Sequence, residues 1–350
     1  MLVSDFDFEL PPELIAQNAA PRGESRLLVL DRSTGATTHA GVADLPSLLR
    51  AGDLLVVNDT RVFPARLLGR RVPSGGAVEC LLLGEPGDGG PGTWDALMHP
   101  GQKLKPGSIV EFTGPSGTLR AEVLARRFQG RRTIRLWSES SQPVAALIDA
   151  LGHVPLPPYI DRADTPDDRE RYQTVFARER GSIAAPTAGL HFTDAILDRL
   201  HANGIERCAV TLHVGYGTFK PVKVDRVEHH VVDPEPYTIA PDVAERINRA
   251  RAEGRRVIAI GTTTTRAIED AARRADGRVA SGSAFAETFI YPGFTFQVID
   301  GLITNFHLPR SSLLMLVSAV AGRERVLTAY GEAVAQRYRF YSYGDAMLIA

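Results

Sequence analysis

The amino-acid sequence predicts an α/β main domain, with a mixed sheet and flanking helices, that is interrupted by an inserted small antiparallel β-barrel. Three observations support this fold class. Apolar runs of strand length occur in residues 1–66, short strand-like segments separated by Gly and Pro fill residues 67–150, and strands alternate with helices in residues 151–350. Such alternation is typical of α/β domains, whereas closely spaced short strands favour a barrel or a sandwich. We therefore expect residues 1–66 and 151–350 to form one domain around the insertion.

The α/β segments contain apolar runs and signals for helix ends. RLLVLDR (26–32) and DLLVVND (53–59) have the length and composition of buried strands. A short helix between them should begin near Pro46, because proline is tolerated in a first helical turn. Thr193 is the predicted N-cap of a helix that ends before Gly204. Further along, CAVTLHVG and RVIAIG are predicted strands, and PDVAERINRARAEG and TTTTRAIEDAARRADG are predicted helices.

The insertion is predicted to be all β. Five segments alternate or concentrate apolar residues over strand length, and Gly and Pro at high density separate them. These segments are VECLLL, TWDALMHP, IVEFTG, TLRAEVLARR and RRTIRLWS. Strands at this spacing indicate a small antiparallel barrel or sandwich.

The composition is that of an ordinary globular protein and excludes several classes. The chain has 350 residues, a formal net charge of −1, 44% apolar and 23% charged residues, which excludes global disorder. Cys80 and Cys208 are the only cysteines and lie far apart, so we expect no disulfide framework and a reducing, cytoplasmic location. The N-terminal MLVSDFDFELPPELIAQ lacks the basic end and apolar run of a signal peptide. The longest apolar stretch, from Leu313, is too short for a membrane helix, which needs about 20 residues.

Basic residues show one asymmetry, since four of the 40 are Lys and the rest are Arg. Coding bias explains such an excess, and so does recognition of phosphate, carboxylate or base edges by guanidinium groups. The insertion is rich in arginines, several of which should line one surface, and these are Arg70, Arg71, Arg120, Arg126, Arg127, Arg131, Arg132 and Arg135. Alternate residues of a hairpin share a face, so we expect a basic surface that fits a phosphate backbone. A solvated charged face is the alternative.

The segment VIAIGTTTTRAIED (257–270) is a candidate anion site. An apolar strand ends at Gly261, and Thr262 and Thr263 open a helix. Free N–H groups and the positive end of the helix dipole favour an anion there, and Arg266 adds donors. The alternative is that Thr262 simply caps the helix. The segment contains neither a dinucleotide-binding nor a Walker motif.

The segment SIAAPTAGLHFT (182–193) is a candidate ligand site because its small residues allow a backbone to approach a ligand closely. Thr187 and Gly189 belong to it, and His191 stands just before a predicted helix. A structural histidine is the alternative.

The segment TLHVGYGTFKPV (211–222) carries His213 on a strand that breaks at Gly215 and Gly217. In α/β folds ligands bind outside the carboxyl ends of strands. An ordinary bulge or turn is the alternative.

Two further segments combine polar groups with apolar runs. In VVNDTRVFPARLLGRR (56–71), Asp59 and Arg61 either form a structural pair or present charges to a polar substrate, and Arg66 follows. In TNFHLPR, Asn305 and His307 precede a buried run. Five histidines are scattered without a known zinc spacing, so we expect no metal; they are His191, His213, His229, His230 and His307.

Motifs along the whole chain resemble those of one bacterial family, the S-adenosylmethionine:tRNA ribosyltransferase-isomerases (QueA). The chain departs from the family pattern at GTTTTR and at HHVVDPE, which leaves open whether His229 or His230 has a role. The motifs are SDFDFELPPELIAQ, SRLLVLDR, GDLLVVNDTRVFPARLLG, GHVPLPPYI, RYQTVFA, GSIAAPTAGLHFT, VTLHVGYGTFKPV, RVIAIGTTTTRAIE, FIYPGF, TNFHLPRSSLLMLVSA and YRFYSYGDAMLI.

The resemblance implies an enzyme of queuosine biosynthesis. Members transfer and isomerise the ribosyl part of S-adenosylmethionine onto 7-aminomethyl-7-deazaguanine at the wobble position of tRNA. Epoxyqueuosine-tRNA forms, and adenine and methionine are released. The resemblance also implies a cytoplasmic monomer with an α/β domain and an inserted barrel. It implies S-adenosylmethionine as co-substrate, no prosthetic group, no metal and no membrane association.

This chemistry assigns roles to the candidate residues. A base removes a proton from the ribose carbon beside the sulfonium, and an acid protonates the departing adenine. Histidine suits such transfers near neutrality. We therefore expect His191 and His213 to be the leading acid–base candidates, followed by His307 and Asp59. We expect Arg126, Arg127, Arg131 and Arg132 to bind tRNA. The expected substrate-binding residues are Arg61, Arg66, Thr187, Gly189, Gly215, Gly217, Thr262, Thr263, Arg266 and Asn305.

Two other functions remain open from the sequence. One is an α/β transferase or hydrolase acting on a small nucleotide, with the barrel as a lid. The other is a non-catalytic RNA-binding protein. The first predicts activity without tRNA, and the second predicts salt-dependent RNA binding without adenine release.

Overall fold

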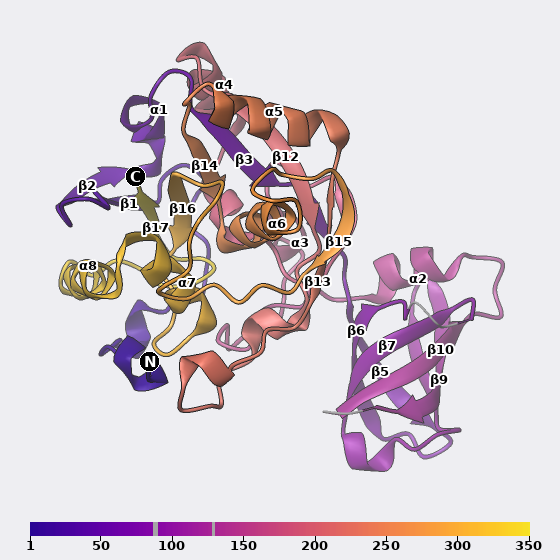
Figure 1. The fold of residues 1–350 in the computed structure, drawn as a ribbon. Helices are drawn as coiled ribbons and strands as arrows, with labels where there is room; N and C mark the ends of the chain where they lie inside the picture. The colour runs from indigo at the N-terminus through magenta and orange to yellow at the C-terminus, as the bar shows by residue number, and fades with distance from the viewer. Residues whose placement is uncertain (87–89, 128–129) are drawn as a thin grey trace.

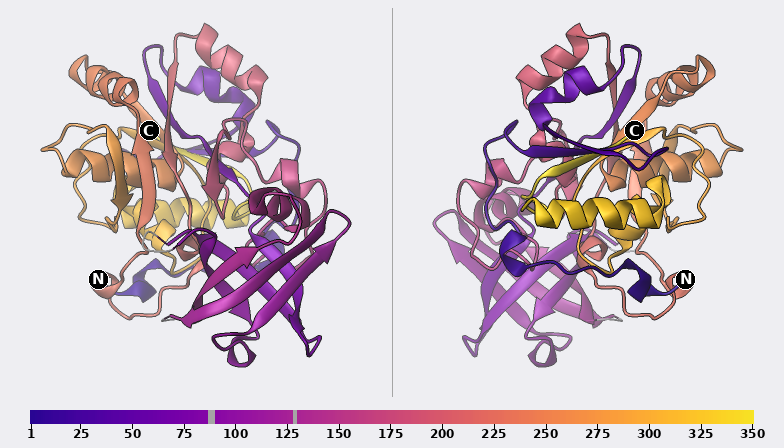
Figure 2. Two further views of the ribbon diagram at one scale, coloured as in Figure 1. Left: turned by 90° about the vertical axis from the view of Figure 1, so that its right-hand side faces the viewer. Right: turned by 90° about the vertical axis from the view of Figure 1, so that its left-hand side faces the viewer.

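The computed structural model describes residues 1–86, 90–127 and 130–350. It contains a large α/β body and a smaller closed barrel that lies to one side of it (Figure 1). The predicted fold class is thus confirmed. Both chain termini belong to the α/β body (Figure 2).

The α/β body is built on a nine-stranded sheet in the order β15-β13-β12-β3-β14-β16-β17-β1-β2. Its four central strands, β12, β3, β14 and β16, are mutually parallel, and antiparallel pairs flank them, as β12 with β13 and β16 with β17. The sheet is therefore mixed, as predicted. The strands are β1 (Arg26–Leu30), β2 (Thr37–Gly41), β3 (Leu54–Asn58), β12 (Glu206–Leu212), β13 (Glu235–Ile239), β14 (Val257–Ile260), β15 (Gly282–Ala286), β16 (Gly301–Asn305) and β17 (Ala346–Ile349).

Helices cover both faces of this sheet. In β3, Leu54 and Val56 pack into one apolar cluster and Leu55 and Val57 into another, because successive side chains of a strand point to opposite faces. Burial on both faces explains why the strands are continuous apolar runs. The first cluster includes α5 (Pro241–Ala252), α6 (Thr262–Arg273), α7 (Ser312–Ala321) and α8 (Arg323–Ala335), and the second includes α1 (Leu45–Leu48) and α4 (Asp194–Ala202).

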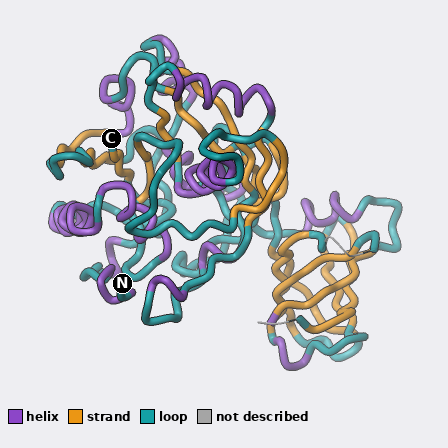
Figure 3. The backbone as a smooth tube through the Cα atoms, in the orientation of Figure 1, coloured by secondary structure: helices purple, strands orange, loops and turns teal. Residues whose placement is uncertain are grey.

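The helix predictions at residues 193–204, 241–254 and 262–277 are confirmed by α4, α5 and α6. The Thr193 hydroxyl accepts the Ile196 N–H at the start of α4. The apolar run from Leu313 forms the buried helix α7. Figure 3 shows how loops and short helical turns join these elements. The short elements are η1 (Val3–Phe6), η2 (Pro12–Leu14), η3 (Val42–Asp44), η4 (Gly101–Lys103), α3 (Asp168–Arg171), η6 (Thr187–His191), η7 (Tyr216–Phe219) and η8 (Val227–His229), with β4 (Thr60–Val62) paired to β11 (Glu179–Ser182).

The inserted barrel is closed, with the strand order β10-β7-β6-β5-β8-β9, and all its pairings are antiparallel. Closure removes exposed sheet edges. Leu147 and Ile148 of α2 (Val144–Leu151) join its apolar core. The strands are β5 (Arg66–Val72), β6 (Ala77–Gly84), β7 (Thr93–His99), β8 (Ile109–Gly114), β9 (Gly117–Arg126) and β10 (Arg131–Trp137).

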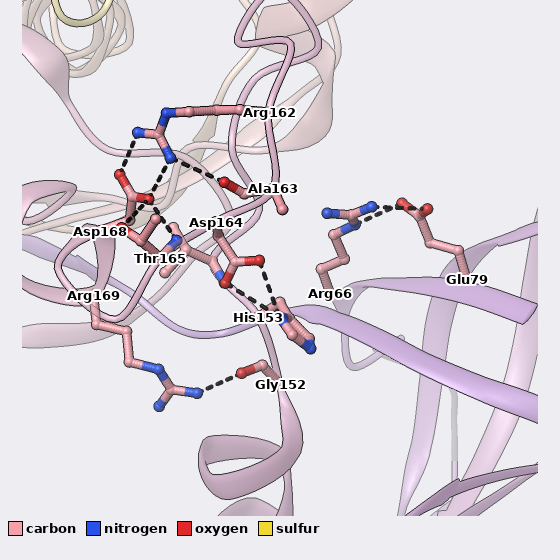
Figure 4. Close-up of polar contacts among 11 residues, drawn as sticks. Arg66, Glu79, Gly152, His153, Arg162, Ala163, Asp164, Thr165, Asp168 and Arg169 are labelled. Atoms are coloured by element: carbon pink, nitrogen blue, oxygen red, sulfur yellow. Dashed lines mark hydrogen bonds and ion pairs between the residues drawn. The ribbon is translucent and has the colours of Figure 1, made fainter. Parts of the chain in front are cut away.

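The chain enters and leaves the barrel side by side (Figure 4). The Arg66 N–H donates to the His153 carbonyl at 3.3 Å, and the His153 N–H donates to the Arg66 carbonyl at 2.8 Å. Gly152 has no room for a side chain here, since a Cβ would lie 2.0 Å from the Pro64 carbonyl oxygen. This close crossing ties the two connections of the barrel together.

Candidate active site

The carboxyl ends of the four central parallel strands bring candidate residues to one edge of the sheet. Asp59 follows β3, His213 follows β12, Thr262 follows β14 and His307 lies two residues after β16. Carboxyl ends of parallel strands meet at a common edge, where α/β folds bind ligands. These candidate residues therefore come together at the edge of the sheet where the sequence predicted a crevice. In place of one crevice, three neighbouring hollows lie there.

The first hollow, here called the sheet-edge cavity, encloses about 540 Å³ and is lined without any Lys, Arg, Asp or Glu side chain. Four of the expected substrate-binding residues line it, namely Thr187, Thr262, Thr263 and Asn305. Aromatic rings supply much of the rest, from Tyr159, Tyr172, Phe219 and Tyr341. Burial raises the pKa of Tyr341 to about 12, so its hydroxyl stays neutral. The cavity suits a flat, uncharged group with a few polar atoms.

The start of α6 forms one wall of this cavity. Gly261 is the N-cap, with φ +90°, so the alternative that Thr262 caps the helix is wrong. The Thr264 and Thr265 hydroxyls donate back to the carbonyls of Ile260 and Gly261, at 2.7 and 3.1 Å. The first backbone N–H groups of a helix have no partner within the helix, and here they lie at the cavity wall. They favour an electron-rich ligand atom.

His191 lies behind Asn305 rather than in the cavity. Asn305 Nδ2 donates to the Tyr341 carbonyl and contacts His191 Nε2, both at 3.1 Å. His191 Nε2 must therefore accept, and Nδ1 donates to Ser25 Oγ at 2.9 Å. Burial lowers the pKa of His191 to about 4. The imidazole is neutral and holds the Asn305 amide in one orientation.

Asn305 Oδ1 is buried and, within the described part of the chain, has no hydrogen-bond partner. Asn305 lines the sheet-edge cavity. A buried polar atom without a partner is destabilising by about 1–3 kcal/mol. This oxygen is thus available to a ligand.

His307 also lies in a dry environment. Its Nε2 is 3.0 Å from Thr304 Oγ1, and its backbone N–H donates to the Tyr330 hydroxyl at 3.1 Å. Burial lowers its pKa to about 3. His307 lines the cavity, but it is poorly suited to take up protons near neutral pH.

His213 faces a different hollow, the interdomain cleft, which encloses about 1090 Å³ between the barrel and the α/β body. His213 Nδ1 is 2.7 Å from Thr60 Oγ1, and burial lowers the pKa of the half-buried ring. Strand β12 ends at Leu212, so His213 begins the loop that follows. Gly181 packs against this ring, and a Cβ there would lie 2.6 Å from it. The packing fixes a neutral imidazole at the wall of the cleft.

Asp59 and Arg61 do not form the pair that the sequence suggested. Asp59 instead binds Arg178 at 2.8 Å and accepts from the Thr211 hydroxyl at 2.6 Å, while Arg61 is exposed on β4. Arg66 binds Glu79 within the barrel, with contacts of 2.9 and 3.1 Å (Figure 4). Neither Asp59, Arg61 nor Arg66 lines the sheet-edge cavity or the interdomain cleft.

Arg266 and Gly217 line a third, charged hollow of about 550 Å³, whereas Gly215 and Gly217 both line the interdomain cleft. Arg266 pairs with the buried Glu235 and donates to the Ala286 carbonyl at 2.8 Å. The Gly215 N–H donates to the same Glu235 at 2.9 Å. Gly217 packs against Asp233, where a Cβ would lie 2.8 Å from the Asp233 side chain. Arg266 is therefore largely committed to internal partners.

Gly189 has a packing role of its own in η6. A Cβ at this position would lie 2.8 Å from the Thr174 side chain. The close approach explains a glycine there without a ligand.

The four barrel arginines that were expected to bind tRNA do not share one exposed surface. Arg132 is buried and donates to the carbonyls of Gly130 and Gly101, both at 2.8 Å. Adjacent strand residues point to opposite faces, so Arg131 points outward and binds Asp233 of the α/β body at 3.1 Å. Arg126 and Arg127 are exposed near the rim. Of the four, Arg131 alone lines the interdomain cleft.

Sequence reasoning missed the aromatic lining and one cation. Tyr159, Tyr172 and Tyr341 come from loops with no local motif for binding, and Trp94 and Arg180 meet in the cleft from distant segments. Tyrosines next to glycine in YSYGD were the one available hint. The described residues contain no group of three His, Cys, Asp or Glu that fits a metal ion. None of their helices is long and apolar enough to span a membrane.

Comparison with known proteins gives matches along the whole chain. Residues 3–349 match the sequence profile of the family described as "Queuosine biosynthesis protein". A protein of Heliobacterium modesticaldum named S-adenosylmethionine:tRNA ribosyltransferase-isomerase is 53% identical over 350 residues, covering 100% of both chains. One of the same name from Anaeromyxobacter sp. is 54% identical over 352 residues, covering 100% of this chain and 99% of the other.

A solved structure is similar as well. The crystal structure of S-adenosylmethionine tRNA ribosyltransferase from Thermotoga maritima is 37% identical, with a TM-score of 0.55, and the match covers 99% of this chain and 100% of that chain. The fold and the sequence thus point to the same relatives.

Proposed function

Because the chain belongs to the family of queuosine biosynthesis proteins, we propose that it is an S-adenosylmethionine:tRNA ribosyltransferase-isomerase. It transfers and isomerises the ribosyl part of S-adenosylmethionine onto 7-aminomethyl-7-deazaguanine in tRNA. The observation that carries this proposal is the identity of about half of all residues, over the full length, to relatives of that name. The wobble position as acceptor follows from the same resemblance.

The reaction sets the number of proton transfers that the site must support. One proton leaves the ribose carbon beside the sulfonium, and one leaves the attacking amine. Adenine departs with the electron pair of its glycosidic bond and takes up one proton, while methionine departs with the pair of the carbon–sulfur bond. Two protons are lost and one is taken up, so the reaction releases one net proton, which balances the lost positive charge of the sulfonium. A neutral base at the site is required.

His213 fits the role of that base better than the other histidines. It is neutral near pH 7 because its pKa is lowered by burial, and it lines a cleft large enough for substrate. A general base needs a position within hydrogen-bond reach of its proton and a pKa near the working pH. His191 and His307, with pKa values of about 4 and 3, position neighbouring groups instead.

The sheet-edge cavity suits the adenine part of S-adenosylmethionine. Its aromatic, uncharged lining matches a purine, and Asn305 Oδ1 can accept from the exocyclic amine. The backbone N–H groups at the start of α6 can donate to ring nitrogens and stabilise the negative charge that develops on departing adenine. The neighbouring charged hollow shares Thr218 and Leu313 with this cavity and suits the methionine zwitterion.

Release of adenine tests the proposed function. The protein is incubated with S-adenosylmethionine and tRNA carrying the aminomethyl-deazaguanine base, and free adenine is measured, with tRNA omitted as the control. Release that requires this tRNA is the expected result. Release without tRNA indicates a nucleotide hydrolase, and no release together with RNA binding indicates a non-catalytic protein.

We also propose that the enzyme acts as a cytoplasmic monomer without a prosthetic group. Sedimentation at several protein concentrations tests the monomer, with a constant mass of about one chain as the expected result.

A further inference from the structure

Resting on the proposed function, we infer that the interdomain cleft takes one tRNA nucleotide, turned out of the anticodon loop, between the barrel and the α/β body. The cleft is open to solvent and has about 1090 Å³ of space between the two walls, which leaves room for a nucleotide. Enzymes that modify a base act on unstacked nucleotides, and proteins read RNA loops by stacking bases on aromatic side chains.

The barrel side of the cleft provides a stacking surface. Trp94 lies on β7 and is partly exposed. Its ring centroid is 6.0 Å from that of Phe63, with an interplanar angle of 51°. The guanidinium carbon of Arg180 lies 4.8 Å from the Phe63 ring centroid. Stacking of a base on an aromatic side chain contributes about 1–3 kcal/mol.

Cations stand on both sides of the cleft. Arg131 comes from the barrel and Arg180 from the α/β body, and both line the cleft. Arg131 binds Asp233 at 3.1 Å and Arg180 binds Asp149 at 2.7 Å, with all four side chains between 31% and 52% exposed. Ion pairs this exposed contribute little to stability, so phosphate oxygens can replace the carboxylates. Glu85, Asp233 and Glu235 also line the cleft, so the two guanidinium groups, and not the lining as a whole, are the partners for the phosphates on either side of the turned-out base.

The wall of the cleft that belongs to the α/β body carries the proposed base, His213. His213 and Gly181 both line it, and His213 Nδ1 is occupied by Thr60 at 2.7 Å. This leaves Nε2 for a ligand proton. Trp94 and His213 line the same cleft, so the inference places the aminomethyl group of a base stacked on Trp94 beside this imidazole. The cleft therefore differs from an exposed basic patch, because it orders the nucleotide beside the proposed base.

The two tryptophans allow a direct test of stacking. Trp94 and Trp137 are the only ones in the chain, and Trp137 is not part of the cleft lining. The Trp137→Phe variant therefore reports on Trp94 alone. It is titrated with an anticodon stem-loop RNA that carries the aminomethyl-deazaguanine base. We expect saturable quenching of its fluorescence, and no such quenching in the matched Trp94→Phe variant.

Kinetics of variants separate this inference from the proposed function. We expect Trp94→Ala and Arg180→Ala each to raise the KM for tRNA at least tenfold, with the KM for S-adenosylmethionine within twofold of the parent. Arg180 is half-exposed, so its variant folds whether or not Trp94→Ala does. Arg135→Ala, which removes an exposed barrel arginine bound to Glu122, is the control and leaves both KM values unchanged.

Specific outcomes overturn the inference. They are an unchanged KM for tRNA in Arg180→Ala, or RNA binding with no change in Trp94 fluorescence. Failure of the parent enzyme to release adenine counts instead against the proposed function. If Arg135→Ala raises the KM for tRNA as much as Arg180→Ala does, the outer barrel surface binds the RNA and the cleft assignment is wrong.

Discussion

The sheet-edge cavity and the interdomain cleft lie at the same edge of the sheet, yet they place histidines in opposite environments. His191 and His307 are buried near the cavity, with pKa values lowered to about 4 and 3. His213 lines a cleft of about 1090 Å³ and is half-buried. Desolvation disfavours the charged form of a histidine, so buried imidazoles become fixed hydrogen-bonding groups. A partly hydrated imidazole can still exchange protons with a substrate.

Replacing His213 should have the largest effect, because its partial exposure makes it the proposed proton acceptor. We expect His213→Ala to lower kcat by about 10²–10⁴-fold, the usual contribution of general acid–base catalysis. His213→Gln, which keeps polar atoms but not the basicity, should be equally impaired. Adenine release at saturating substrates measures the effect.

His201→Ala is the matched control for His213, since His201 is exposed on α4. It should retain the parental rate. A His213→Gln enzyme within threefold of the parent would remove this histidine from the mechanism.

Removing the Asn305 amide should affect binding rather than chemistry. Leaving a buried polar group of the ligand without its hydrogen bond is unfavourable by about 1–3 kcal/mol, so we expect Asn305→Ala to raise the KM for S-adenosylmethionine by about 5–150-fold. The KM for tRNA should stay within twofold, because Asn305 does not line the interdomain cleft.

Asn248→Ala controls for loss of a structural amide. Asn248 bonds the Val279 backbone at 2.9 Å through both amide atoms, and it lines neither hollow. Equal KM changes in the two variants would contradict an adenine site at Asn305.

Acid should destabilise the fold through the two dry histidines. Their folded pKa values lie below the unfolded value of about 6.5, so the unfolded state binds more protons between these values. Their full contribution is present above pH 6.5 and declines as the pH falls toward 4 and 3. Each histidine should lower the free energy of unfolding by about 2 kcal/mol between pH 7 and pH 5.

Urea denaturation followed by far-ultraviolet circular dichroism at several pH values measures this effect. His307→Gln should reduce the pH dependence and not merely the stability at pH 7. An unchanged slope in this variant would show that His307 is hydrated, and the contrast between the two regions would weaken.

The smallest effect is expected for an exposed barrel pair. Arg135 and Glu122 are in contact at 2.6 Å, with Arg135 55% exposed. Exposed ion pairs typically contribute about 0–1 kcal/mol, so Arg135→Ala should lower the free energy of unfolding by less than about 1 kcal/mol. A larger loss, measured by urea denaturation, would mean that the barrel surface is more ordered than its exposure indicates.

Local sequence determined much of the fold and some of the site. Continuous apolar runs such as β3, the Thr193 N-cap and the Gly- and Pro-rich spacing of the insertion each encode an element through nearby residues. Placement of Thr262 and Asn305 at a ligand cavity was also predictable, because Thr262 follows an apolar strand and Asn305 ends one.

Tertiary structure alone decided which imidazoles are buried, which arginine binds Asp59, and which arginines face the cleft. Burial of His191 depends on Ser25 and Asn305, which are 166 and 114 residues away in sequence. Asp59 binds Arg178 and not Arg61 because β4 pairs with β11. Desolvation and ion pairing depend on distance in space, and only the folded chain sets those distances.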